Sequence, residues 1–492
     1  MMPRLRLTLS LLPALLPAPL LAQDPAPDLA GELGRTLEAL VADLPGRPLP
    51  LDAVVRTAMD HNLPLEASRL RRRIAGAEVT TEAGLFDPAL SLRADLVRSR
   101  GATQETGTYS ARLDQVLPWG TEIGVGVDGA RYPAAAVPGS RYDADVGLFL
   151  RHPVLEGFLT RDTELEVARR LERASVHRLA RAMQSVTAEV TLAYWDLAEA
   201  EAIQAVLRRS YQIAEALLFR NRQLAARELV AQVDVITARS GVALRRAGLV
   251  DARRSRLDAA EALVFLVWGA EAEEELARDT VPVKTAPTRL DVPVLGPRDE
   301  IEARALDERN DISAARLELE GAREAARATQ NARLPFLALE SSLRTGGTDP
   351  SFQGSLGALD QGTSWSLGLA FAQPLGNRRD RGLDRIADLD VDLRALELTI
   401  VENLVRQDVR LAVRAISAGQ ERLEAAEEAA ELARAQLDAE RGRLELGLGD
   451  SFRLLETEEN AVQAELESVR ARYDLARAIT RYRLAVGELV PG

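Results

Sequence analysis

Residues 364–386, SWSLGLAFAQPLGNRRDRGLDRI, decide the fold of this chain. As far as Ala372 the segment alternates between larger apolar side chains and small ones, which is typical of a β-strand with two different faces. The alternation ends at Pro374 and Gly376. From there to about residue 490 there is no proline, and the apolar residues take a helical spacing. A strand therefore runs directly into a very long helical region.

The chain contains this arrangement twice. Residues 58–96 align with residues 305–343, and the identical pairs include Asp60/Asp307, Arg69/Arg316, Pro88/Pro335, Leu90/Leu337 and Leu96/Leu343. We therefore expect a first repeat at 51–269 and a second at 298–490. The linker at 270–297 contains four prolines, which predicts an irregular crossing and not a buried element.

Both repeats have the same predicted order: a helix, strands, and a long helix hairpin. About four strands are expected within 86–152 and two within 335–374, and the hairpins are expected at 155–269 and 378–490. The hairpins turn near 226–235 and 445–455, where Asp450 or Ser451 is suited to cap the next helix. One arm, residues 161–224, would be about 95 Å long at ~1.5 Å per residue.

The predicted strands carry apolar side chains on one face and polar or charged ones on the other. Long loops alternate with a tight turn at PWGT, residues 118–121. This pattern is typical of an outer-membrane barrel, although a soluble β-sandwich with one wet face has the same alternation. Six strands are too few to close a wide barrel, and open edges are not tolerated in lipid, so several copies must share it.

Composition excludes several classes of function. The 492-residue chain has a net charge of -13 and an isoelectric point near 5.1, which argues against nucleic acid as a partner. It has no cysteine, which rules out disulfides, thiolate metal sites and lipidation of an N-terminal cysteine. Its three histidines are scattered and no catalytic or nucleotide-binding motif occurs. We expect no enzyme activity, no cofactor and no metal.

The N-terminus predicts export. Arg4 and Arg6 precede an apolar run from Leu7 to Leu21, which together form a signal peptide over residues 1–22. Cleavage after Ala22 is expected, although the exact bond is open, and residues 23–50 would be an N-terminal extension. No run of 18 apolar residues remains, so entry into a membrane would require strands.

The chain resembles the TolC family of outer-membrane efflux and secretion channels over nearly its whole mature length. The resemblance is carried by LPLDAVVRTAMDHN, EVTLAYWDLAEAEA, FAQPLGNRRDRG and, most strongly, the C-terminal segment that begins RLELGLGDSFRLLETEENAVQ. It implies a mainly α fold with a transmembrane β part, in which a homotrimer shares one outer-membrane barrel continuous with a periplasmic helical tunnel. It also implies passive transport, with a periplasmic adaptor protein and an inner-membrane RND pump or ABC exporter as partners.

The resemblance also assigns candidate sites. The gate candidates at the periplasmic tips are Arg453, Glu456 and Asp234. The candidates for adaptor docking are Gly447, Leu448, Gly449, Asp450 and Ser451 in the second tip and Leu229, Val230 and Ala231 in the first. The junction between barrel and tunnel would lie at Pro153, Gly157, Pro374 and Gly376. Arg453 stands where the family typically has an acid, so three Arg453 and three Glu456 side chains would pair in a mixed ring. The alternative is a surface Arg453 that contacts Glu456 along its own helix.

Two questions stay open from the sequence. Family members commonly give four strands per chain, so the extra hairpin within residues 109–130 either enlarges the barrel to eighteen strands or lies outside it. The competing function is an exported coiled-coil scaffold or adhesin stalk without a pore. The substrate, whether a drug, a metal ion or a protein, is not readable from the sequence, nor is the pump that the channel serves.

Overall fold

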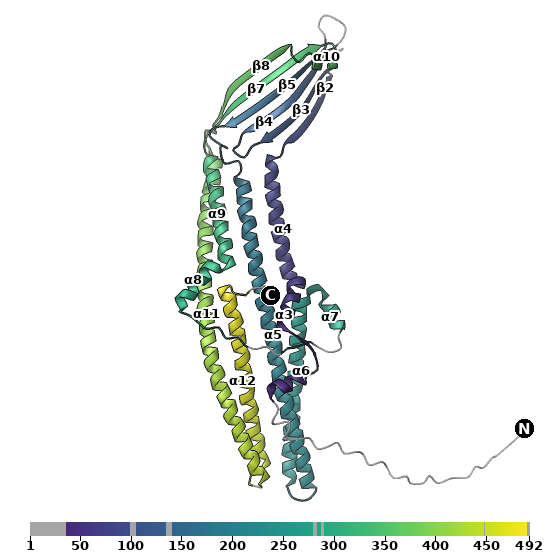
Figure 1. Ribbon diagram of the computed structural model, residues 1–492, viewed down its shortest axis with the longest axis vertical. Helices are drawn as coiled ribbons and strands as arrows, with labels where there is room; N and C mark the ends of the chain where they lie inside the picture. The colour runs from purple at the N-terminus through teal and green to yellow at the C-terminus, as the bar shows by residue number, and fades with distance from the viewer. Residues whose placement is uncertain are drawn as a thin grey trace, which may run out of the picture. The chain divides into compact units, whose positions relative to one another are not determined.

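The computed structural model describes residues 36–98, 105–133, 140–278, 283–286, 290–446 and 448–489 (Figure 1). The predicted signal peptide and Gly447 lie outside these residues. The chain forms two compact units. The coil unit comprises residues 36–44, Ala202–Arg254 and Ala429–Leu466, and the sheet unit comprises Pro45–Glu201, Ser255–Glu428 and the chain from Glu467 onward.

The sheet unit contains one six-stranded antiparallel sheet in the order β2-β3-β4-β5-β7-β8. Repeat 1 supplies β2 (Ala89–Arg98), β3 (Glu105–Val116), β4 (Glu122–Pro133) and β5 (Ser140–Pro153). Repeat 2 supplies β7 (Phe336–Asp349) and β8 (Gly362–Ala372). The division into four and two strands is the one predicted from the sequence, and β2 and β8 are the two edges.

The helices repeat in the same order. Repeat 1 has α3 (Leu51–His61), α4 (Leu63–Ala83), η1 (Gly84–Phe86), α5 (Thr163–Ala225) and α6 (Gln232–Trp268). Repeat 2 has α8 (Arg298–Glu308), α9 (Asn310–Asn331), α11 (Arg378–Glu445) and α12 (Ser451–Val486). α5 has 63 residues and α11 has 68. Among the described residues, no helix combines the length and the apolar character that a membrane span requires.

Two apolar cores hold the helical part of the sheet unit together. In the first, α3, α5 and α6 bury side chains that include Val54, Tyr194 and Leu263. In the second, α8, α9, α11 and α12 bury side chains that include Ile312 and Ile416. In the coil unit, the short helix α2 (Leu37–Ala42) packs Leu40 against Ala205 of α5.

The linker between the repeats differs from the sequence expectation. It contains η2 (Gly269–Glu271), α7 (Ala272–Arg278) and β6 (Val283–Thr285), and β6 pairs in parallel with β1 (Arg47–Leu49). Val283 and Thr285 are buried, so the prediction of an unburied crossing was wrong for this segment. The connection between the two strands of repeat 2 also contains a short helix, α10 (Phe352–Gly357), which follows the end of β7 at Asp349.

A buried carboxylate fixes β6 to α5. Glu201 is fully buried and accepts hydrogen bonds from both the backbone N–H and the hydroxyl of Thr285. Burial raises the pKa of Glu201, although the bonds from Thr285 and the charges of Arg256 and Lys284 oppose the rise. The free energy of unfolding therefore includes a part that depends on pH.

We predict that the stability of this region falls as the pH rises from 4.5, the ordinary pKa of the carboxyl group, to the raised pKa of Glu201. The sign follows because the folded chain holds the proton more tightly than the unfolded chain. Glu201→Gln should flatten this part of the pH profile of thermal unfolding. Glu189→Gln, an exposed position on the same helix, is the matched control and should leave the profile unchanged. An unaltered profile in Glu201→Gln would contradict the assignment.

Candidate functional site

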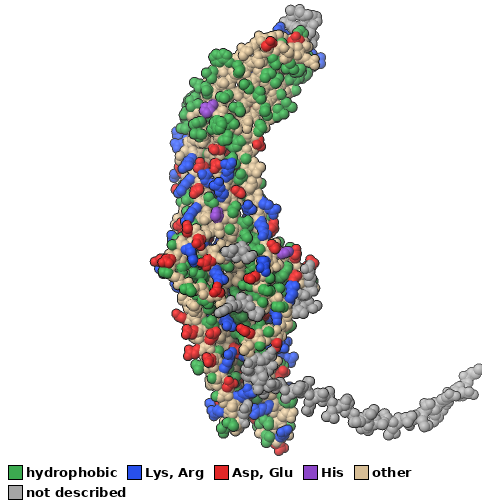
Figure 2. All heavy atoms as spheres, in the orientation of Figure 1, with side chains coloured by type: hydrophobic (Ala, Val, Ile, Leu, Met, Phe, Trp, Pro, Cys, Tyr) green, Lys and Arg blue, Asp and Glu red, His purple; other side chains and the backbone are tan. Residues whose placement is uncertain are grey.

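One face of the sheet is apolar across all six strands. The residues Leu90, Leu113, Val125, Leu148, Leu343 and Trp365 are successive partners in neighbouring strands. Leu90 is 68% exposed and Trp365 is 76% exposed, so the row remains open to the outside even at the two edge strands. Figure 2 shows this part of the molecule covered with hydrophobic side chains, in contrast to the mixed charges on the helices.

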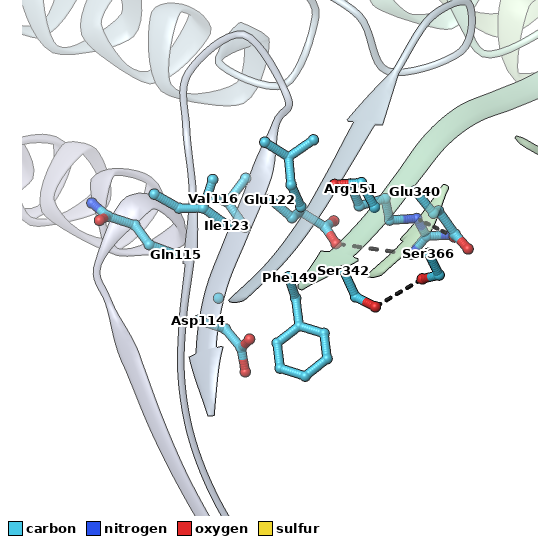
Figure 3. A pocket seen from close by; sticks show the side chains of 13 residues that line it. Asp114, Gln115, Val116, Glu122, Ile123, Phe149, Arg151, Glu340, Ser342 and Ser366 are labelled. Atoms are coloured by element: carbon cyan, nitrogen blue, oxygen red, sulfur yellow. Dashed lines mark hydrogen bonds and ion pairs between the residues drawn. The ribbon is translucent and has the colours of Figure 1, made fainter. Parts of the chain in front are cut away.

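The opposite face of the sheet is polar. Its central row runs Ser91, Arg112, Gly126, Gly147, Arg344 and Ser364 from β2 to β8. Nearer the helices, Arg151 lies between Glu122 and Glu340, at 3.8 and 3.3 Å. A cavity of about 330 Å³ opens here, and the hydroxyls of Ser342 and Ser366 share a hydrogen bond of 2.8 Å at its margin (Figure 3). A sheet with one apolar and one charged face is typical of strands that lie between lipid and water.

The strand-to-helix junctions are held by side chains that the sequence did not reveal. Gly157, one of the predicted junction residues, has a positive φ of 84° and donates its N–H to the Asn331 side chain at 2.8 Å. Asn331 ends α9 in the other repeat and also donates to the Leu155 carbonyl at 3.2 Å. This asparagine therefore links the exit of β5 to the end of α9. Its only sequence signal is an amide at a helix end.

The other predicted junction residues have less specific positions. Pro153 is the last residue of β5, while Pro374 and Gly376 are exposed between β8 and α11. A Cβ added at Gly376 would meet no atom within 4 Å, so packing does not require glycine there. Asn377 instead takes the positive φ of 37° in this turn and donates to the Arg333 carbonyl at 3.1 Å.

The two hairpin tips lie in the coil unit and expose apolar side chains. In the first tip, Leu229 is 66% exposed, Ala231 is exposed and Val230 is half-buried. In the second, Leu448 is 69% exposed, and the Asp450 side chain accepts the Arg453 N–H at 2.7 Å. Asp450, one of the two cap candidates from the sequence, is thus the cap of α12. Ser451 is the first residue of that helix.

The gate candidates lie in the first turns after the two tips. Asp234 is half-buried in the first turn of α6, and Arg453 and Glu456 are exposed near the start of α12. Among the described residues of one chain, Arg453 and Glu456 form no ion pair with each other. Arg209 and Glu465, which also belong to the coil unit, do form one. Within one chain, neither side chain therefore neutralises the charge of the other.

Buried ion pairs connect the helices of the coil unit. Arg245 of α6 pairs with Glu458 of α12, and both are buried. Ser210 of α5 donates to Glu458 at 2.7 Å and accepts from Arg245 at 3.0 Å. Burial raises the pKa of Glu458, and the guanidinium of Arg245 opposes that rise. This triad therefore depends on every partner being present.

The comparisons with known proteins agree with this geometry. Residues 303–488 match the family model described as outer membrane efflux protein. The outer-membrane channel OprN has a TM-score of 0.67 at 21% identity, over 89% of both chains. CmeC of Campylobacter jejuni has a TM-score of 0.66 at 16% identity, over 89% of this chain and 85% of that one. The open state of MtrE from Neisseria gonorrhoeae gives 0.63 at 19%, over 89% and 88%. No curated protein matches the chain.

The second repeat is similar to outer membrane efflux proteins. The model match covers almost the whole of the predicted repeat at 298–490, and the structural likeness extends the same fold through the first repeat. The resemblance to the TolC family that the sequence motifs carried is thereby confirmed. Within the described ranges of the chain, no group of His, Asp and Glu side chains is placed to hold a metal ion.

We predict that Arg245→Met destabilises the coil unit by about 3–5 kcal/mol at neutral pH, because Glu458 would remain as an unpaired buried carboxylate. The loss should be smaller at acidic pH, where Glu458 takes up a proton. The double variant Arg245→Met/Glu458→Gln should recover much of the stability.

Thermal unfolding in detergent measures this effect. Arg434→Met is the matched control, because Arg434 is exposed and Glu465 keeps its other partner, Arg209. Its loss should stay below about 1 kcal/mol, as for other exposed pairs. Equal losses in Arg245→Met and Arg434→Met would contradict a special role for the buried triad.

Proposed function

We propose that this protein is the outer-membrane exit duct of a tripartite efflux pump or a type I secretion system, and that it conducts substrates passively to the outside. The observation that carries the proposal is the unbroken apolar row across six strands, on a sheet whose other face is charged. The match of residues 303–488 to outer membrane efflux proteins supports it. The alternative, an adhesin stalk or scaffold without a pore, gives no reason for such a sheet.

The duct is a homotrimer in this proposal. The two edge strands β2 and β8 run in opposite directions, because each of the five strand pairings between them is antiparallel. The β8 edge of one copy therefore fits the β2 edge of the next in an antiparallel pairing. Three copies of six strands give eighteen. Since barrel diameter grows roughly linearly with strand number, this barrel is about 1.5 times as wide as one of twelve strands.

A second surface supports association of copies. α11 carries a stripe of apolar residues spaced three and four apart, Ile386, Leu389, Leu393, Leu396, Ile400 and Leu404, and each is 49–65% exposed. This spacing is typical of helices that pack against another helix in a coiled coil. A stripe of this length is too apolar to remain in water. We infer that another copy of the chain covers it.

The remaining partners follow from the family. The exposed apolar tips, Leu229 and Leu448 with the residues around them, are proposed to dock a periplasmic adaptor protein, and an inner-membrane RND pump or ABC exporter supplies the energy. Outer-membrane lipid covers the apolar face. The signal peptide and the absence of lipidation belong to this proposal as well.

We also propose that Arg453 and Glu456 of three copies form the mixed ring at the periplasmic gate.

We predict a native mass near three protomers in detergent and a disulfide-linked trimer when cysteines are placed in the seam. The chain has no native cysteine, so pairs are easily introduced. Combinations of Ser91→Cys or Arg93→Cys on β2 with Ser364→Cys or Ser366→Cys on β8 scan the seam on its polar face. At least one combination should link copies on oxidation, because facing Cβ atoms in antiparallel strands lie about 4.5–5.5 Å apart.

Gly124→Cys with Ser366→Cys is the matched control for this experiment. It would link copies only if β4, instead of β2, met the neighbouring β8, which is a twelve-strand arrangement with β2 and β3 outside the barrel. Cross-linking of this pair alone would overturn the eighteen-strand barrel but keep the duct. A monomer in solution that never enters the membrane would overturn the duct itself.

We predict that Arg453→Asp raises the cation-to-anion permeability ratio of the channel in planar bilayers by about threefold or more, since charged rings set the selectivity of pores. In a trimer the substitution changes the charge of the ring by six units, two in each of three copies. Arg472→Asp, at an exposed position farther along α12, should have little effect. An unchanged ratio in Arg453→Asp would rule out the mixed ring.

A further inference from the structure

Phe149 breaks the pattern of the polar face. It lies on β5 between Gly124 and Ser342 of the neighbouring strands, where the adjoining rows hold charged, hydroxyl-bearing or glycine residues. Its ring is held by two guanidinium groups, those of Arg112 on β3 and Arg344 on β7. Each guanidinium carbon is 4.9 Å from the ring centroid. Such stacking of arginine on an aromatic ring is attractive because the ring face is electronegative.

Two glycines make room for this cluster. Gly126 and Gly147 occupy the same cross-strand row as the two arginines, between them. A Cβ at Gly126 would lie 2.8 Å from the Arg112 side chain, and one at Gly147 would lie 3.0 Å from Arg344 and 3.2 Å from Phe149. The ring and the aliphatic stems of the two arginines therefore lie directly on bare backbone. Any larger residue at either position would displace them.

The two arginines differ in their charge balance. Arg112 is paired with Asp128 at 3.2 Å. Among the described residues, no carboxylate lies within ion-pair distance of Arg344, whose one recorded side-chain partner is the ring of Phe149. Arg344 therefore presents an uncompensated positive charge on the polar face. One face of its guanidinium stacks on Phe149, which leaves the opposite face and the N–H groups for another partner.

We propose that Arg112, Phe149 and Arg344 form a docking site for planar aromatic anions on the inner wall of the barrel. This inference rests on the proposed function, because the polar face lines a lumen only in the closed trimer. A guanidinium offers donors in a plane that match a carboxylate or sulfonate, and its free face stacks on an aromatic ring. The trimer contains three such sites at one level of the wall.

The surroundings of the site set the polarity of the ligand. The cavity of Figure 3 adjoins Phe149 on the side nearer the helices, and its charged lining residues are Asp114, Glu122, Glu340 and Arg151. The three carboxylates outnumber the one guanidinium, so they disfavour a second negative charge but accept hydrogen bonds from hydroxyl groups. The ligand class is therefore an aromatic ring with one anionic group toward Arg344 and a hydroxyl group at the far end.

Single-channel recording with 6-hydroxynaphthalene-2-sulfonate tests the proposal, because this probe stays ionised at all working pH values. We expect it to block the current of the wild-type channel at concentrations where the cationic 2-naphthylmethylammonium does not. Arg344→Gln should raise the half-blocking concentration by about fivefold or more, since it removes one charged, stacking contact. Arg344→Lys keeps the charge without the planar fork and should be intermediate.

Arg93→Gln is the matched control, because Arg93 lies on the same face but in the row that contains Asp128 and Asp145. It should leave the block unchanged. A conducting channel that the two probes block equally, or whose block is the same in Arg344→Gln and Arg344→Lys as in wild type, would overturn the docking site and leave the duct intact. A trimer that does not conduct at all would overturn the proposed function, and the docking site with it.

Discussion

Every backbone N–H and C=O group that enters lipid needs a hydrogen-bond partner within the protein. The six-stranded sheet satisfies this requirement at four of its strands and leaves one side of β2 and one side of β8 without a strand partner in the part of the chain that the structure describes. An apolar face that reaches both of these edges is unsuited to water, and the open edges are unsuited to lipid. Pairing with further copies would resolve both conflicts, so the proposed oligomer follows from the sheet and is not an addition to it.

The sequence predicted those features that depend on local patterns. Alternation of side chains located all six strands, the prolines marked where strands begin or end, and Asp450 marked the start of α12 because its cap needs only three neighbouring residues. The parallel pairing of β1 with β6 was missed. Each strand has three residues, and their partner is more than two hundred positions away, so no periodicity within either segment reveals it.

The side chains that hold the structure together were harder to predict than the elements. Arg245 and Glu458 are buried, but every long helix of this chain carries many arginines and glutamates, and most of them are solvated. Which pair is buried depends on how the helices are placed around each other. Phe149 presents the same difficulty, because alternation assigned the polar face correctly while the role of its ring depends on arginines from two other strands.

The duplication shows which parts of the design are constrained. At the joint between α3 and α4, the Asn62 side chain caps α4 and donates a hydrogen bond to the Leu266 carbonyl. At the corresponding joint of repeat 2, between α8 and α9, Arg309 pairs with Asp311 and Asp408. Different chemistry therefore supports the same joint between two helices.

The number of strands is less constrained than the joints, but it can change only in steps of two. A single added strand would place the following helix on the wrong side of the membrane, and it would make β2 and β8 parallel. An added hairpin of two strands leaves the helices on the same side and keeps the seam antiparallel. In the proposed trimer, the extra hairpin of repeat 1 would therefore widen the pore without changing how the copies meet.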